Sequence, residues 1–464
     1  MSIGNVFDVA VRAMSAYQQA VDVTSNNISN ASNPDYSRQR VEFSTVTAEN
    51  GRGAGVAVSN VQRLQDDLLG VQIRNYNSKS SDANKRSQVL SQIESIIAEP
   101  SDIGLSNYMT EFFNSWDKLS AQPNSTSLRL NVIQRAQNVS DRFQQVLTGL
   151  NDVQTSLQTE ANNIASTINS YLSDITGYNQ KISESEMRGI KANELKDQRD
   201  SLITKLSKLV NVTVQNNPNG SVTVNVGGLH GADINTHDEF ELKIVNGQMR
   251  LASKNDSSAI ALLNGGELYA ISDLYSNKIS QYKSEISSLE NAFVNNVNSL
   301  HMSGNTLING ASSSTGIPFF GEVDTNGNVI GAISDGSLKI NSSILQNPSN
   351  IAASSVANND GNGLNANKIA RLMETKIPEL NDKTLGDYYS MTMNSIGLDK
   401  VSNDNAVQST ESILLKLDNQ KNSTSGVSLD EEMTNVLKFQ RSYDAASKMI
   451  KVADEMIQTI LQMV

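Results

Sequence analysis

Residues 3–28 of the chain read IGNVFDVAVRAMSAYQQAVDVTSNNI, and this stretch decides the fold. Its apolar residues recur at alternating steps of four and three, which places them on one face of a helix. A helix of this length spans roughly 39 Å and has no second apolar face with which to build a core. The stretch therefore predicts a coiled-coil helix that needs partners. The positions of this amino-terminal seam are Ile3, Phe7, Ala10, Met14, Tyr17, Val21, Thr24 and Ile28, of which only Thr24 is not apolar.

The carboxy-terminal stretch from Leu429 carries a second seam of the same kind, interrupted only at Glu432. At its start Ser428 can cap a helix and Glu431 can complete a capping box, with carboxylates at the positive end of the helix dipole. Two seams at opposite ends of one chain are best explained if they pair with each other and with neighbouring copies. The positions of this carboxy-terminal seam are Val436, Phe439, Tyr443, Ala446, Ile450, Ala453, Ile457, Ile460 and Val464.

An asparagine-rich segment follows the first seam and reads TSNNISNASNPDYSRQ at residues 24–39. Considered alone, such a segment is a helix cap followed by a loop. It also resembles the signature behind the first helix of the bacterial flagellar axial proteins, the rod, hook and hook-associated families. That signature has an Asn-Asn-hydrophobe-Ala-Asn core followed by Thr-Pro-Gly-Tyr-Ser-Arg-Gln. Here Ser29 stands in place of the alanine, and residues 33–35 read Asn-Pro-Asp.

Further segments extend the resemblance. Residues 427–432, VSLDEE, and the downstream Gln440, Tyr443 and Ala445 are similar to the carboxy-terminal pattern of the family. Residues 264–268 (NGGEL) and 297–301 (VNSLH) resemble the hook-associated branch in particular. The resemblance implies a structural subunit that forms the junction between hook and filament. Two alternatives stay open, another axial protein of the hook or rod, or an exported surface adhesin on the same scaffold.

The resemblance also implies an interface, partners and a location. The implied partners are further copies of the chain in a ring or helical layer, the hook protein, a second junction protein, and an export chaperone on the carboxy-terminal helix. The implied location is extracellular, after export without a cleaved signal. The residues predicted to form the subunit interface are Ile3, Phe7, Met14, Tyr17, Val21, Asn26, Asn27, Ile28, Asn30, Tyr36, Val436, Phe439, Gln440, Tyr443, Ile450, Ile457 and Ile460.

The middle of the chain alternates between helix and strand patterns. Four-three spacing predicts a helix over 128–186, and helical patterns recur at 195–209 and 268–300. Strand and turn signals at 212–226 and 240–251 predict hairpins. We expect the helices of 195–209 and 268–300 to pair, with the β insertion projecting outward between them.

These patterns predict a mainly α, elongated, multidomain protein with β insertions. Paired terminal coiled-coil helices should join a central bundle of long helices and an outer β-rich domain. The expected domains are an amino-terminal axial helix (1–35) paired with a carboxy-terminal one (428–464), a helical rod (36–210, completed by 265–302 and 375–427), a β-rich insertion (211–264) and an outer region of strands and loops (303–374).

Composition and side-chain chemistry argue against catalysis. The net charge of −12 disfavours nucleic acid and anionic membranes, and the absence of cysteine excludes thiolate chemistry. No apolar run is long enough to span a bilayer, so we expect no membrane insertion. His230, His237 and His301 show no metal-ligand spacing, and we expect Trp116 in a helix-packing core rather than a sugar site. We therefore predict no enzyme activity, no catalytic residue, no cofactor and no metal.

Overall fold

The computed structural model describes residues 3–47, 53–97, 101–308, 312–334 and 336–463. The helices are α1 (Ile3–Ser29), α2 (Asp67–Ile97), α3 (Leu105–Ala121), α4 (Thr126–Met187), α5 (Asn193–Leu209), α6 (Glu267–Asp273), α7 (Ile279–Ser303), α8 (Ser342–Gln346), α9 (Leu364–Ala370), α10 (Leu385–Ser425) and α11 (Leu429–Met463). A π-helical turn, η1 (Leu274–Lys278), joins α6 to α7, and 3-10 turns occur at Pro348–Asn350, Arg371–Glu374 and Pro378–Leu380.

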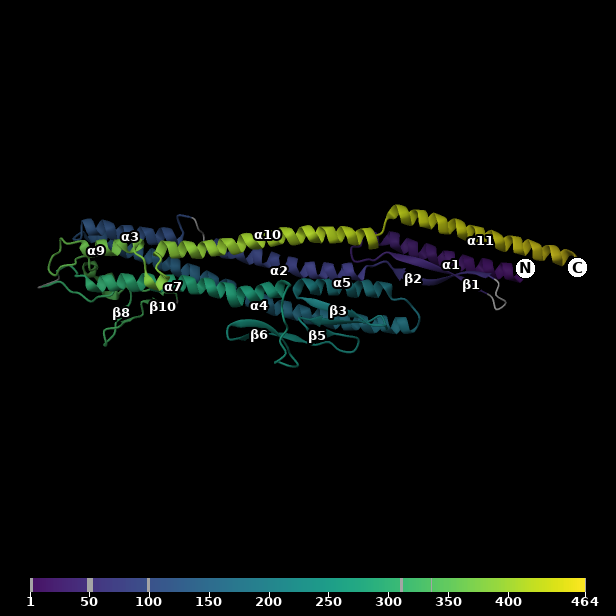
Figure 1. The fold of residues 1–464 in the computed structure, drawn as a ribbon, viewed down its shortest axis with the longest axis horizontal. Helices are drawn as coiled ribbons and strands as arrows, with labels where there is room; N and C mark the ends of the chain where they lie inside the picture. Colours follow the sequence, from purple (N-terminus) through teal and green to yellow (C-terminus); the bar gives the residue numbers. More distant parts are fainter. Residues whose placement is uncertain (1–2, 48–52, 98–100, 309–311, 335, 464) are drawn as a thin grey trace.

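The strands form small antiparallel sheets. They are β1 (Gln39–Thr47), β2 (Gly53–Arg63), β3 (Val212–Asn216), β4 (Val222–Val226), β5 (Leu229–Ala232), β6 (Phe240–Val245), β7 (Gln248–Ser253), β8 (Glu322–Val323), β9 (Val329–Ile330), β10 (Ile333–Ser334) and β11 (Ser337–Leu338). The molecule is elongated, with both termini at one end and β8, β10 and α9 at the other (Figure 1). This confirms the predicted mainly α, elongated fold.

The rod is organised around α4, which is 62 residues long and matches the predicted helix over 128–186. Its amino-terminal half packs beside α7, where the rings of Phe143 and Phe293 lie 6.1 Å apart. Its carboxy-terminal half packs beside α5, where Arg199 Nη1 reaches Asn179 Oδ1 at 3.4 Å. The predicted pairing of 195–209 with 268–300 is therefore wrong, because α4 is long enough for both segments to pack along it in succession. Trp116 is fully buried in the rod, which confirms it as core.

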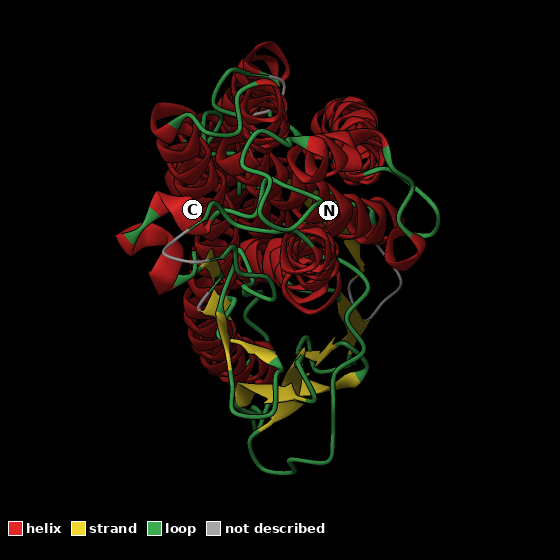
Figure 2. Ribbon diagram, turned by 90° about the vertical axis from the view of Figure 1, so that its left-hand side faces the viewer, coloured by secondary structure: helices red, strands yellow, loops and turns green. Residues whose placement is uncertain are grey.

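The β insertion, β3–β7, is part of the core of the rod. Its strands lie along one side of the helices (Figures 1 and 2). Val224, Val226 and Leu251 are fully buried and belong to the same hydrophobic cluster as the apolar face of α4. Two asparagine side chains of α4 hydrogen-bond to the backbone of the strands. Asn179 accepts from the N–H of Val222 at 3.0 Å and donates to its carbonyl at 2.8 Å. Asn169 accepts from the N–H of Phe240 and donates to its carbonyl, both at 2.8 Å. The insertion therefore does not project as an independent unit.

Helix α7 buries two titratable side chains whose pKa values shift in opposite ways. His301 is fully buried; its Nδ1 donates to the carbonyl of Ile317 at 2.7 Å, and its Nε2 accepts from the Ala352 amide at 2.9 Å. Burial lowers the pKa of His301 to about 4. Glu290 is also buried, its Oε1 lacks a hydrogen bond, and burial raises its pKa to about 7. Both side chains are therefore neutral over much of the pH range between these values.

The two groups should make opposite contributions to the pH dependence of stability. The folded-state pKa of His301 lies below its ordinary value of 6.5, so its contribution is lost as the pH falls from about 6.5 to 4. The folded-state pKa of Glu290 lies above its ordinary 4.5, so its contribution is lost as the pH rises from about 4.5 to about 7. In Glu290→Gln the contribution of Glu290 is removed while that of His301 remains. We expect the variant, measured by urea unfolding, to lose about 2 kcal/mol more than the wild type between pH 6.5 and 4.5. Equal slopes would contradict this assignment.

Candidate assembly interface

The chain ends form one module. Helices α1 and α11 lie side by side and run antiparallel (Figure 1). The β1–β2 hairpin lies along α1, and the ring of Phe43 in β1 sits 5.8 Å from Tyr17 of α1 and 5.9 Å from Phe439 of α11. The hairpin therefore belongs with the terminal helices, whereas the sequence analysis assigned it to the rod. We call α1, β1, β2 and α11 the terminal module.

Small residues make the contact between the paired helices. In α1 the buried apolar residues are Ala10, Ala16 and Ala20, and in α11 they are Ala446 and Ala453. Alanine lets the two backbones approach closely but buries little apolar area per residue. None of the larger apolar residues of the two helices is fully buried among the described residues. Ala10 belongs to the predicted seam of α1, whereas Ala16 and Ala20 lie beside it, so the apolar surface of α1 is wider than the single face that was expected.

Large apolar side chains lie exposed on the outside of the terminal module. On α1 they include Phe7, 42% exposed, and Val11, 44% exposed. We call this set the outer stripe. On α11 it comprises Leu429, Met433 and Leu437 on one side of the helix and, nearer the end of the chain, Met449, Val452, Met456, Ile457, Ile460 and Leu461 on its other sides. An exposed apolar surface of this extent marks an interaction site rather than an ordinary protein surface.

The predicted interface residues fall into separate groups. Phe7, Ile457 and Ile460 are exposed and lie on the outer stripe, and Gln440 is exposed as well. Asn27 and Tyr36 are buried with partners inside the chain, which moves them from the predicted interface to an internal joint. The side chain of Ile3 lies outside the described residues. The half-buried residues are Met14, Tyr17, Val21, Asn26, Ile28, Asn30, Val436, Phe439, Tyr443 and Ile450.

The elements of the terminal module meet one another at a polar joint centred on Asn27. Its Nδ2 donates to the carbonyl of Gln39 at 2.8 Å and to Glu432 Oε2 at 2.9 Å. Its Oδ1 accepts from the Tyr36 hydroxyl at 2.8 Å and from the Gln39 amide at 3.0 Å. Every donor and lone pair of this amide is used. Asn27 thus ties α1, the segment before β1 and α11 together.

Glu432 explains why the carboxy-terminal seam is interrupted. Its side chain is buried at a seam position. Its Oε1 accepts a hydrogen bond from Arg38 Nε at 2.8 Å and lies 2.7 Å from Arg38 Nη2. Arg38 Nη1 also pairs with Glu431 at 2.9 Å. The Tyr-Ser-Arg-Gln segment near one end of the chain therefore bonds to the Asp-Glu-Glu segment near the other. A buried carboxylate needs such partners, since leaving it unpaired costs several kcal/mol.

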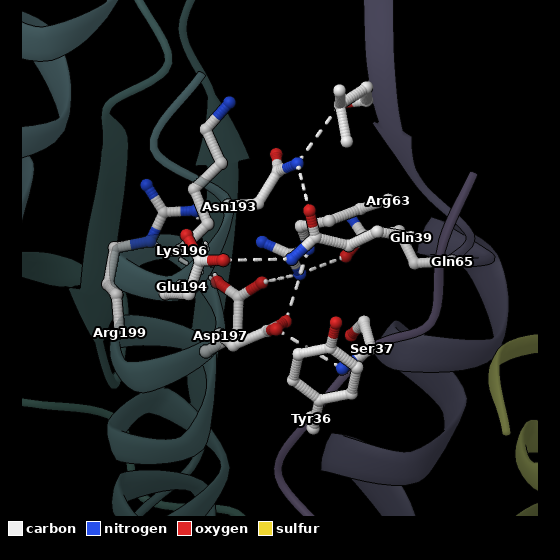
Figure 3. Close-up of polar contacts among 12 residues, drawn as sticks. Tyr36, Ser37, Gln39, Arg63, Gln65, Asn193, Glu194, Lys196, Asp197 and Arg199 are labelled. Carbon is white, nitrogen blue, oxygen red and sulfur yellow. Dashed lines mark hydrogen bonds and ion pairs between the residues drawn. The ribbon is translucent and has the colours of Figure 1, made fainter. Parts of the chain in front are cut away.

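A second set of bonds connects this joint to α5 (Figure 3). Asp197 Oδ2 accepts from the Ser37 amide at 3.1 Å, and its Oδ1 lies 3.2 Å from Arg63 Nε. Burial raises the pKa of the Asp197 carboxyl, against the opposing effect of Arg63. Burial and the nearby carboxylates of Glu194 and Asp197 also raise the pKa of the Tyr36 hydroxyl, so it stays a donor. The hairpin base is held to the rod by charge and hydrogen bonds rather than by apolar packing.

Two polar clefts flank the loop of residues 30–36. The larger, about 410 Å³, lies between this loop and α5; the smaller, about 230 Å³, faces the carboxy-terminal end of α10. Within the described residues no group of three or more His, Asp or Glu side chains is placed to hold a metal ion. Nor does any described helix combine the length and hydropathy needed to cross a bilayer. The ion pairs and hydrogen bonds of the joint hold the surrounding helices and strands in position.

Sequence reasoning missed the residues of α5 and β2 in this joint. Asp197 and Asn193 carry no motif, and their convergence with Arg63 depends on how α5 folds back along α4. A signal did exist for Glu432, because a charged residue at an otherwise apolar seam position requires a specific partner. The carboxylates of residues 430–432 were predicted only to cap the helix. In the structure two of them, Glu431 and Glu432, also pair with Arg38 at the joint.

Comparison with known proteins agrees with this architecture. The model of the flagellar hook-associated protein FlgK helical domain matches residues 90–320. The flagellar basal body rod FlgEFG protein carboxy-terminal model matches 419–463, and the flagella basal body rod protein model matches 7–36. The chain belongs to the flagellar hook-associated protein family. The rod models cover the two ends that form the terminal module, and the hook-associated model covers much of the rod.

Relatives of the hook-associated family extend over the whole chain. Flagellar hook-associated protein 1 of Bacillus subtilis (strain 168) is 28% identical over 98% of this chain and 97% of its own length. The Escherichia coli (strain K12) protein of the same name is 22% identical over 99% of this chain and 100% of its own. The structure of the flagellar hook junction protein FlgK from Burkholderia pseudomallei matches 76% of this chain and all of its own, with a TM-score of 0.63 at 13% identity. This last likeness supports the fold.

Proposed function

We propose that this chain is a structural subunit of the bacterial flagellum and forms the junction between hook and filament. The observation that carries the proposal is the terminal module, which turns alanines inward and large apolar side chains outward. A monomer gains nothing from an exposed stripe of this kind, whereas packing against further copies would bury it. Membership of a family of flagellar structural proteins fits a role in assembly rather than catalysis.

The proposed mechanism is geometric. Neighbouring terminal modules pack through their outer stripes into a wall, and the polar joint fixes the angle at which each rod leaves that wall. The rod and its β insertion then present the outer surface of the junction. In this proposal the hook protein and a second junction protein contact the layer on either side, and an export chaperone covers α11 before assembly. In this proposal the chain acts at the extracellular hook–filament junction.

The function is tested by placing a charge on the outer stripe. We expect Ile457→Asp to leave the rod folded, because Ile457 is 40% exposed and makes no part of the core. In an assembled wall the same carboxylate would be buried without a partner, at a cost of several kcal/mol. Cells should therefore export the variant but lack filaments, as measured by electron microscopy and by blotting the medium. Gln458→Asp, an exposed neighbour off the stripe, serves as the control. Normal filaments on Ile457→Asp cells would contradict the proposal.

A further inference from the structure

His301 connects the end of α7 to two separate segments of the outer region of strands and loops. Its Nδ1 lies 2.7 Å from the carbonyl oxygen of Ile317, and its Nε2 lies 2.9 Å from the backbone nitrogen of Ala352. A carbonyl can only accept and an amide N–H can only donate, so Nδ1 carries the proton and Nε2 offers its lone pair. The two contacts therefore fit the neutral ring in a single tautomer.

Protonation of this ring would set two donors against each other. An imidazolium carries hydrogen on both nitrogens, so Nε2–H would face the N–H of Ala352, while the bond from Nδ1 to Ile317 would be kept. The ring is fully buried, and the ring centroids of Trp116 and Phe319 lie 6.0 Å and 5.4 Å from its own. A protonated ring therefore has no water to bond, and it disrupts only one of its two backbone contacts.

The charged group that acts on His301 is a buried arginine of α4. Arg129 is 1% exposed, and its Nη1 donates to the carbonyl of Ile351 at 2.6 Å. Burial lowers the pKa of Arg129 to about 10, against the opposing effect of Asp360, so the guanidinium stays charged wherever His301 titrates. On α7 itself, Glu290 is about three turns away. Arg129 therefore repels a second positive charge at His301.

The two segments bonded to His301 are held with unequal strength. Phe319 and Phe320 are fully buried, and Asn298 of α7 accepts from the Phe320 amide at 2.8 Å and donates to its carbonyl at 2.9 Å. Residues 348–354, which we call the latch segment, instead bury one isoleucine and two alanines. The latch segment also contains the amide that loses its acceptor on protonation. It is therefore the segment that gives way.

We propose that His301 is an acid-sensitive latch, which holds the latch segment on the rod while it is neutral and releases it once it is protonated, with residues 317–320 kept in place. The inference goes beyond the proposed function and concerns another part of the molecule. Asn365 of α9 donates to the carbonyl of Ala352 at 2.8 Å, and α9 lies at the end of the molecule opposite the termini (Figure 1). Burial lowers the pKa of His301 to about 4, so release belongs to acid conditions.

Hydrogen exchange of the full chain at pH 6.5 and 4.5, corrected for the intrinsic effect of pH on exchange, tests the latch. With a pKa of 6.5 when released and about 4 when buried, His301 should make opening of the latch segment on the order of 40-fold more frequent at pH 4.5. Exchange at residues 318–321, and at 140–180 within α4, should change by less than about threefold. Opening of 318–321 to the same extent as the latch segment, or no opening of the latch segment, would overturn the proposal.

Two substitutions at position 301 separate titration from packing. The amide of His301→Gln reaches the place of Nε2 and can accept from Ala352 without titrating, whereas that of His301→Asn reaches the place of Nδ1 and leaves Ala352 without an acceptor. We expect the latch segment of His301→Gln to exchange equally at both pH values. In His301→Asn it should exchange about tenfold faster than in the wild type at pH 6.5. The wild-type rise with acid in His301→Gln would show that another group drives the opening.

Fluorescence gives a second measurement on the same proteins. Trp116 is the single tryptophan of the chain and its ring lies beside that of His301, so its emission reports on this site alone. The emission of the wild type should change with a midpoint near pH 4, and that of His301→Gln should stay constant over the same range. The same transition in both proteins would contradict the assignment to His301.

Discussion

Replacing Asn27 by leucine is expected to open the joint that ties α1, β1 and α11 of the terminal module together. The substitution keeps the volume but removes the partners of the Tyr36 hydroxyl, the Gln39 backbone and the buried carboxylate of Glu432. Leaving buried polar groups without partners costs about 1–3 kcal/mol each, and more for a charged group. We expect the free energy of opening at the joint to fall by about 3–5 kcal/mol.

Hydrogen exchange measured by mass spectrometry checks this expectation. Protection of residues 39–47 and 429–437 should be lost in Asn27→Leu, while protection of 128–187 stays unchanged because the rod has its own core. Asn26→Ala is the matched control. Asn26 is half-buried; its contact with Glu194 is a long 3.4 Å, and its Oδ1 accepts a local bond from Asn30 Nδ2 at 2.9 Å, so the substitution should cost about 1 kcal/mol. Unchanged protection of 39–47 in Asn27→Leu would show that the amide does not hold the joint.

Replacing residues 212–263 by a Gly/Ser linker is expected to unfold the middle of the rod. The strands bury Val224, Val226, Phe240 and Leu251 in the core shared with α4. At about 1.5–3 kcal/mol for each buried apolar side chain, the lost contact is on the order of 10 kcal/mol, comparable to the whole stability of a domain. The linker would also leave Asn169 and Asn179 of α4 without their strand partners.

Circular dichroism during heating measures this effect on the purified chain. The replaced chain should lose helix at a temperature well below that of the wild type, or fail to fold. Ile244→Ser is the control, because Ile244 belongs to the same insertion but is 42% exposed and should cost less than about 1 kcal/mol. A linker variant that melts like the wild type would restore the simpler idea of a projecting insertion.

The sequence was sufficient for the parts of the fold that are governed by local periodicity. The length of α4, the two terminal helices and the β6–β7 hairpin, with its turn at Asn246 and Gly247, all follow from spacing and turn chemistry. The packing of helices against one another was not predictable in the same way. Nothing in the patterns of 195–209 and 268–300 reveals that α4 is long enough for both segments to pack along it in succession.

The joint shows the same division between local and long-range information. Glu432 could be recognised as anomalous, yet its partners Asn27 and Arg38 lie near the other end of the chain. The residues Asn27 and Tyr36 were predicted to contact neighbouring subunits, and the structure gives them partners within the chain. The inner alanine face of α1 was hidden because alanine is apolar but small, so the larger residues dominated the pattern.

The central claim is that this chain joins filament to hook, and electron microscopy of flagella from cells that lack it tests the claim most directly. The account predicts hooks of normal length without filaments, with filament protein lost to the medium, and recovery when the wild-type chain is restored. Filaments attached to hooks in the absence of the chain would contradict the account.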